Sequence, residues 1–297
     1  MKQISGHVYV EDQFSIGKRG ANFGFVTTSE GIVLIDPPYL PTDAIKLRRE
    51  LAKRGEVRYI INTEHHIDHI AGNSFFPGTG VSIEGIRELL AGPVTDMVPS
   101  ERLEEVLKDG LDLRRYYSRR VKERDPEGLP LLKNYRFRPP TITFSHRLCL
   151  YVGSHTFELS YMPGHTQSHL GVYIPQEKVF FAGDNVTNRT QPSMAQSFPL
   201  EWVKTLKMIE TMAIDWVVPG HGMVGSKKEV REFRLFLQKC IKIIRNAIRQ
   251  GLSKEEAADN ISFDELSFAK HMGKAVHPGK VMQRRNVLRF FEMLSKA

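Results

Sequence analysis

Short apolar runs separated by turn residues dominate the first part of the chain. The segments 7–10, 22–28 and 31–36 have the composition of strands, because β-branched and aromatic residues fit a pleated, half-buried surface. Residues 42–54 instead place apolar side chains at helical spacing, and the continuous apolar run 58–62 is typical of a strand covered on both faces. The pattern therefore predicts strands interrupted by one helix.

A second region of the same kind follows later in the chain. Strand-like runs occupy 141–144, 148–152, 155–162, 170–175, 178–184 and 216–219, and a helix is predicted at about 200–212. Two strand-rich halves, each accompanied by helices, favour an α/β fold in which two sheets pack face to face with helices outside.

Two further stretches are charged and helical in pattern. Residues 84–138 are interpreted as an insertion, either a wall or lid over a pocket or a plain surface subdomain. Helices are also predicted at 227–250, 254–260, 263–272 and 280–296. We therefore expect a catalytic domain over residues 1–225 and a helical C-terminal extension over residues 226–297.

Positive charge is concentrated in these helical stretches. The chain has 42 Lys and Arg against 34 Asp and Glu, a formal net charge of +8. Residues 226–297 contain 16 Lys and Arg against 8 Asp and Glu, and residues 102–138 contain 11 against 7, so the remainder is net acidic. Basic surfaces attract anions, including nucleic acids, but we favour the interpretation that these charges lie on solvated helix faces.

Metal-binding side chains follow several of the strand-like runs directly. They lie in the segments TEHHIDH (63–69), PGHT (163–166), AGDN (182–185) and PGHG (219–222). Loops at strand ends commonly carry functional residues, and imidazole with carboxylate suits zinc, as well as iron or manganese. A single His before Gly is weak evidence, but four such segments, each after a strand, indicate a metal centre.

Together these motifs resemble the signature of the metallo-β-lactamase superfamily over roughly residues 1–225. That signature is a T-H-x-H-x-D-H loop, then a G-H-T histidine, a G-D aspartate and a G-H histidine, and the matching positions are Thr63, His66, Asp68, His69, His165, Asp184 and His221. The resemblance implies an αβ/βα four-layer sandwich with the site at one edge. It also implies one metal held by residues 64, 66 and 165, a second held by Asp68, His69 and His221, and Asp184 bridging the two.

Glu64 stands where the family has its first histidine. Two carboxylates, two divalent ions and a bridging hydroxide have a formal charge of +1, which Glu64 brings to zero. Less positive charge acidifies a bound water less, and an oxygen ligand moves the preference toward iron or manganese; alternatively, only the second metal site is filled. His65 occupies the variable position of the loop, so we expect it to point away from the metals.

The resemblance implies a metal-dependent hydrolase whose nucleophile is a hydroxide bridging two divalent ions, with zinc as the first expectation. Metal coordination lowers the pKa of water from about 15.7 toward 7. Asp68 is the expected catalytic residue, because it can orient this water and help to move its proton besides binding metal. His169 and Asn185 are candidates for substrate contacts. For His169 we favour a role as a polar residue leading into strand 170–175, and for Asn185 a turn-forming role is about as well supported.

The expected substrate is a small molecule with a carboxylic ester, lactone, thioester or amide bond. Two alternatives stay open: a phosphodiesterase or nuclease, for which the basic tail supplies an electrostatic footprint, and an iron-dependent oxidoreductase, suggested by Glu64. We do not expect nucleic acid as a partner, since no stacking-aromatic motif is present. A homodimer remains an expectation on frequency alone.

The apolar runs of the chain are short. None reaches the roughly 18 residues of a membrane span, and the start, MKQISGHVYVED, has no apolar stretch of signal-peptide length. We therefore expect a cytoplasmic protein with no membrane contact.

Overall fold

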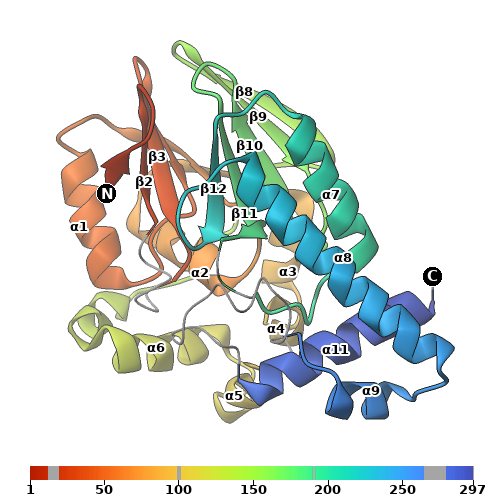
Figure 1. The fold of residues 1–297 in the computed structure, drawn as a ribbon. Coiled ribbons are helices and arrows are strands. Elements are labelled where there is room, and N and C mark those ends of the chain that lie inside the picture. The colour runs from red at the N-terminus through yellow and green to blue at the C-terminus, as the bar shows by residue number, and fades with distance from the viewer. Residues whose placement is uncertain (13–19, 99–101, 189, 191, 264–278, 297) are drawn as a thin grey trace.

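Two mixed β-sheets pack face to face, and helices cover the outer face of each (Figure 1). The computed structural model describes residues 1–12, 20–98, 102–188, 190, 192–263 and 279–296. The order of layers is helix, sheet, sheet, helix, which is the αβ/βα sandwich that the sequence predicts.

The first sheet has seven strands in chain order. They are β1 (Lys2–Gln3), β2 (Val8–Glu11), β3 (Phe23–Thr28), β4 (Gly31–Ile35), β5 (Val57–Ile61), β6 (Thr79–Ile83) and β7 (Ile142–Phe144). Pairing is antiparallel from β1 to β4 and parallel from β4 to β7. Strand β4 is almost completely buried, and this burial accounts for its unbroken apolar sequence. The apolar pattern does not predict β6, because the short segment TGVSI contains only two large apolar residues.

The second sheet has five strands in the order β12-β11-β10-β9-β8. They are β8 (Arg147–Val152), β9 (His155–Tyr161), β10 (Leu170–Ile174), β11 (Val179–Thr187) and β12 (Trp216–His221). Only the β11–β12 pair is parallel. The register between β11 and β12 shifts on both sides of Gly183, and such irregularities re-aim side chains next to functional sites.

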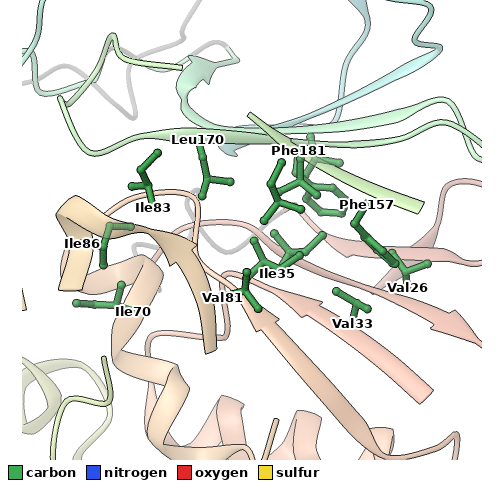
Figure 2. Close-up of a cluster of buried hydrophobic side chains, with 14 of the residues drawn as sticks. Val26, Val33, Ile35, Ile70, Val81, Ile83, Ile86, Phe157, Leu170 and Phe181 are labelled. Atoms are coloured by element: carbon green, nitrogen blue, oxygen red, sulfur yellow. The ribbon is translucent and has the colours of Figure 1, made fainter. Parts of the chain in front are cut away.

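Side chains from both sheets fill the space between them (Figure 2). The first sheet contributes Val26, Val33, Ile35 and Val81, and the second contributes Phe157, Leu170 and Phe181. All are buried, and full burial of one such side chain contributes roughly 1.5–3 kcal/mol. This core fixes the two sheets against each other and therefore fixes the loops at their edge.

The outer helices pack on the sheets through apolar faces. Helix α1 (Pro41–Leu51) covers the first sheet, and helices α7 (Pro199–Thr211) and α8 (Lys227–Arg249) cover the second (Figure 1). Helix α8 begins at a capping box between Ser226 and Glu229, which satisfies backbone N–H groups of its first turn. Its buried side chains recur every three or four residues, as an amphipathic helix requires.

The predicted insertion and tail are helical and gather at the same end of the sandwich (Figure 1). Between β6 and β7 lie α3 (Glu84–Ala91), α4 (Val94–Met97), α5 (Leu103–Lys108), α6 (Leu113–Arg124) and the 3-10 segment η3 (Pro126–Leu132). After α8 come α9 (Lys254–Asn260) and α11 (Lys280–Ser295), which packs on α8 and α9. The predicted helix 263–272 lies outside the described residues, except for Phe263. Among the described helices, none is long and apolar enough to cross a bilayer.

Candidate metal centre

The predicted ligands lie on loops and strand ends that meet at one edge of the sandwich. Glu64 and His66 follow β5, and the short helix α2 (Ile67–Ile70) carries Asp68 and His69; the 3-10 turn η1 (Ala71–Phe75) follows. The other ligands come from the second sheet: His165 follows β9, Asp184 lies in β11 and His221 ends β12. The structure brings all seven together in two adjoining groups.

The first group consists of Glu64, His66, His165 and Asp184, all of which are buried. The Nδ1 atom of His66 is 3.1 Å from Glu64 Oε2, and the Nε2 atom of His165 is 3.7 Å from Glu64 Oε1 and 3.5 Å from Asp184 Oδ2. One ring nitrogen of each histidine therefore faces the same small volume between two carboxylates.

The second group consists of Asp68, His69 and His221. His221 Nε2 lies 3.5 Å from Asp68 Oδ2 and 3.3 Å from Asp184 Oδ2, and His69 Nε2 lies 3.4 Å from Asp184 Oδ1. Asp184 thus contacts both groups. Asp68 and His221 are partly exposed, so the second group forms the open side of the centre.

These spacings fit metal ions better than hydrogen bonds. Ligand atoms around a tetrahedral zinc ion with bonds of about 2.0–2.1 Å lie roughly 3.3–3.4 Å apart, which is close to most distances in both groups. Both Glu64 oxygens, His69 Nε2 and Asp184 Oδ1 are buried without a hydrogen-bond partner among the described residues. Taking a carboxylate out of water costs several kcal/mol, and a bound cation would offset that cost.

The charges within the cluster shift its pKa values in opposite directions. Burial raises the pKa of the Glu64 carboxyl, whereas the charge of His66 lowers it. Burial alone would lower the pKa of His66, but the Glu64 carboxylate and the contact with Gln196 raise it to about 9. The metal-free cluster therefore retains protons at neutral pH, and metals that bind there must replace them.

Asp36 orients the loop that carries the ligands, and the sequence analysis missed it. Its carboxylate accepts hydrogen bonds from the Thr63 backbone N–H (2.8 Å) and the Thr63 hydroxyl (2.6 Å), and lies 2.9 Å from His69 Nδ1. This carboxylate directs His69 Nε2 toward the cluster, as carboxylates behind metal-ligating histidines do. Asp36 adopts φ = +50°, and its position at the end of the apolar run GIVLID was the one available signal.

Gln196 connects the centre to the insertion and the tail, and no sequence signal marked it. Its Oε1 atom is 2.7 Å from His66 Nε2, the nitrogen that points away from the cluster. Its amide nitrogen donates to the carbonyl oxygens of Asp96 (3.2 Å) and Val98 (3.4 Å) at the end of α4. From α11, the Asn286 amide oxygen accepts from the Met194 backbone N–H at 2.6 Å, so the tail holds the same loop.

His65 is absent from both ligand groups, as its place in the loop predicts. It is nevertheless buried, and its ring centroid lies 4.7 Å from that of His66. Both of its ring nitrogens lack a hydrogen-bond partner among the described residues. Burial holds the pKa of His65 well below its ordinary value, so the ring is neutral and supports the loop by packing.

His169 and Asn185 are fully enclosed rather than directed to solvent. Asn185 Oδ1 accepts from the His165 backbone N–H at 2.9 Å, and its amide nitrogen donates to the Met162 carbonyl. The Asn185 backbone N–H donates to His169 Nε2 at 3.2 Å, and burial lowers the pKa of His169 to about 3. This geometry favours a role in positioning His165 and Asp184 over the substrate contacts considered from sequence.

Two glycines allow the ligand strands to approach each other. Gly183 has φ = +50°, and a Cβ atom there would come within 2.5 Å of Thr63 Oγ1. A Cβ atom at Gly220 would collide with the Asp184 carboxylate. The G-D and G-H motifs thus supply backbone space as well as ligands.

Comparison with known proteins identifies the family of the chain. The family model described as metallo-beta-lactamase superfamily matches residues 16–221, more than half of the chain. The chain is 22% identical over 232 residues to a metallo-beta-lactamase type 2 of Elizabethkingia meningoseptica, covering 74% of this chain and 78% of that protein.

Solved structures of similar proteins share the fold. The metallo-beta-lactamase from Pontibacter korlensis gives a TM-score of 0.56 at 18% identity, covering 80% of this chain and 97% of that one. Metallo-beta-lactamase IND-7 gives a TM-score of 0.56 at 17% identity, and the match covers 80% of this chain and 96% of that one. The ligand motifs, the sandwich and the family match agree, and the chain belongs to the metallo-beta-lactamase superfamily.

Proposed function

We propose that this protein is a two-metal hydrolase that cleaves a carboxylic ester, lactone, thioester or amide bond of a small molecule. The observation that supports this most strongly is the spacing of the ligand atoms within each group, where most distances are close to the edge length of a tetrahedral metal site. The partly exposed Asp68 and His221 leave one side of the centre open to a substrate.

Glu64, His66 and His165 would hold one divalent ion, Asp68, His69 and His221 a second, and Asp184 would contact both. Zinc suits this set of imidazole and carboxylate ligands, and Glu64 adds an oxygen donor that also suits iron or manganese. When bound, such ions supply an acidified water and polarise the bond to be cleaved.

Asp68 is proposed as the residue that transfers protons during the reaction. It lies on the open side of the centre, and its carboxylate points toward His221 at 3.5 Å. A carboxylate there can accept a proton from an attacking water and deliver it toward the leaving group. Asp36, Gln196 and Asn185 hold the ligands in place, which restricts motion of the reacting groups.

We also propose that residues 1–225 form the catalytic domain and that the helical segments frame its opening. Gln196 contacts both His66 and the end of α4, and α11 fixes the loop that carries Gln196. The insertion at 84–138 and the extension at 226–297 would therefore set substrate access as well as metal geometry.

A substrate panel with zinc-loaded protein tests the proposed reaction class. The panel contains an aryl ester, a lactone, an acyl thioester, a β-lactam and an aryl phosphodiester. We expect turnover of at least one carboxylic substrate, abolished by chelation and strongly reduced in Asp68→Asn. Turnover of the phosphodiester alone would instead support the nuclease-type alternative. A parallel assay uses iron-loaded protein with an oxidant, and turnover in that assay alone would support the oxidoreductase alternative.

A further inference from the structure

A second cluster of metal-binding side chains lies away from the candidate centre. His7 precedes β2 of the first sheet, His155 begins β9 of the second sheet, and Glu177 lies in the turn between β10 and β11. One ligand atom from each lies within 4.8 Å of the others. The strand from Val179 to Asp184 alone spans roughly 16 Å, so this cluster is at the opposite end of the sheets.

The two imidazoles converge on one carboxylate oxygen. His7 Nδ1 is 2.7 Å and His155 Nε2 is 3.0 Å from Glu177 Oε1. The rings lie 4.8 Å apart at an interplanar angle of 72°. Two ring nitrogens and a carboxylate that face a common point form the N₂O donor set that zinc accepts.

The cluster is held in place before any ion binds. The side chains of His155 and Glu177 are only 3% and 7% exposed, whereas His7 is 54% exposed. Ser154 Oγ lies 3.3 Å from His155 Nδ1 and can accept a ring proton there once an ion has taken the place of the proton on Nε2. Burial raises the pKa of Glu177, but hydrogen bonds from His155 and His7 bring it down to about 2. Glu177 is therefore an anion at neutral pH.

We propose that His7, His155 and Glu177 bind a divalent transition-metal ion, with zinc as the probe, and that this ion joins the ends of the two sheets. The present nitrogen–oxygen distances are a few tenths of an ångström shorter than the edge of a tetrahedral zinc site. The exposed His7 can move outward to accommodate the ion. Binding would displace the protons that His7 Nδ1 and His155 Nε2 donate to Glu177 Oε1, and these protons would pass to the outer nitrogen of each ring. Solvent would reach the ion on the exposed His7 side.

Zinc binding to chelator-stripped full-length protein tests this site. The key variant is Glu177→Gln, which keeps the size of the side chain and an acceptor oxygen. We expect it to bind one zinc equivalent fewer than the wild type, measured by equilibrium dialysis and elemental analysis. The same loss of one equivalent is expected in an Asp184→Asn background, where the candidate centre is disabled. This background separates failure of this site from failure of the proposed function.

A matched control removes a histidine that lies outside the cluster. His146 is exposed in the turn just before β8, and its ring packs near Tyr161, so His146→Gln should leave the zinc count unchanged. His7→Asn, on the exposed side, should lose the same equivalent as Glu177→Gln. Zinc should also raise the melting temperature of Asp184→Asn protein but not of the double variant Asp184→Asn/Glu177→Gln. Equal zinc counts in wild type and Glu177→Gln, or an equal loss in His146→Gln, would overturn the proposal.

Discussion

The two groups of the candidate centre contrast most in their access to solvent. Glu64 and His165 have side-chain exposures of 0% and 3%, whereas Asp68 and His221 have 28% and 24%. The buried group contains a carboxylate whose isolation from water costs several kcal/mol, so an ion bound there would stabilise the fold strongly. The open group faces solvent, where a substrate and its proton transfers need access. We infer that the first group retains metal and the second supports chemistry.

Asp184→Asn should have the largest effect, because Asp184 contacts both groups. Its loss should remove metal from both and reduce kcat/KM by about 10³-fold or more, since several kcal/mol of metal-dependent stabilisation disappear. Metal analysis and hydrolysis assays on one preparation check this. An unchanged metal content with full activity would show that Asp184 is not a shared ligand.

A pair of matched carboxylate-to-amide variants separates the two groups. Asp68→Asn should keep the metal of the buried group and lower kcat by about 10²–10⁴-fold, the usual contribution of a proton-transferring group. Glu64→Gln should lose the buried metal and lower the melting temperature of zinc-loaded protein. If both variants lose the same metal equivalent, the division into a retaining and a reacting group is wrong.

Gln196→Ala tests whether the helical segments control the buried group. It removes the partner of His66 Nε2, and we expect about a 10–100-fold loss of zinc affinity, as for other residues that orient metal ligands. Asn286→Ala releases the same loop from α11. It should also lower the zinc affinity, but by a smaller factor than Gln196→Ala. Unchanged zinc affinity in both variants would show that the helical segments do not influence the metal centre.

His65→Ala should have the smallest effect on the centre. Truncation of the buried ring leaves a cavity and costs roughly 1–3 kcal/mol of stability, but no ligand is lost, so zinc stoichiometry should stay at the wild-type value. An emptied centre in this variant would mean that the loop places His65, rather than Glu64 or His66, on the metal.

The sequence pointed to candidate ligands, but not to the residues that support them. Each candidate sits in a short motif directly after a strand-like run, and it was the four motifs together that indicated Glu64, His165 and Asp184. Gln196 could not, because it lies 130 positions from His66 and no local pattern marks it. The enclosure of His169 also depends on strands that are remote in sequence. For the same reason, His7, His155 and Glu177 were not recognised as a cluster before the fold brought them together.

The elements of the fold could likewise be predicted only where their sequence pattern is local. Long periodic segments such as 227–250 were predicted within a few residues, because their pattern is local. Strand β6 was missed because TGVSI becomes a buried strand through its neighbours β5 and β7. The local sequence pattern thus predicted most helices and strands of the layers. The contacts that position the candidate ligands depend on residues far apart in the sequence.

The most direct test of the two-metal claim is the zinc stoichiometry of the Glu177→Gln protein, in which the remote cluster is disabled. Chelator-stripped protein is dialysed against zinc and measured by elemental analysis. Two equivalents per chain, both absent after Asp184→Asn is added, are the predicted result. One equivalent or none would contradict a two-metal centre and would show that Glu64 does not replace the family's histidine as a working ligand.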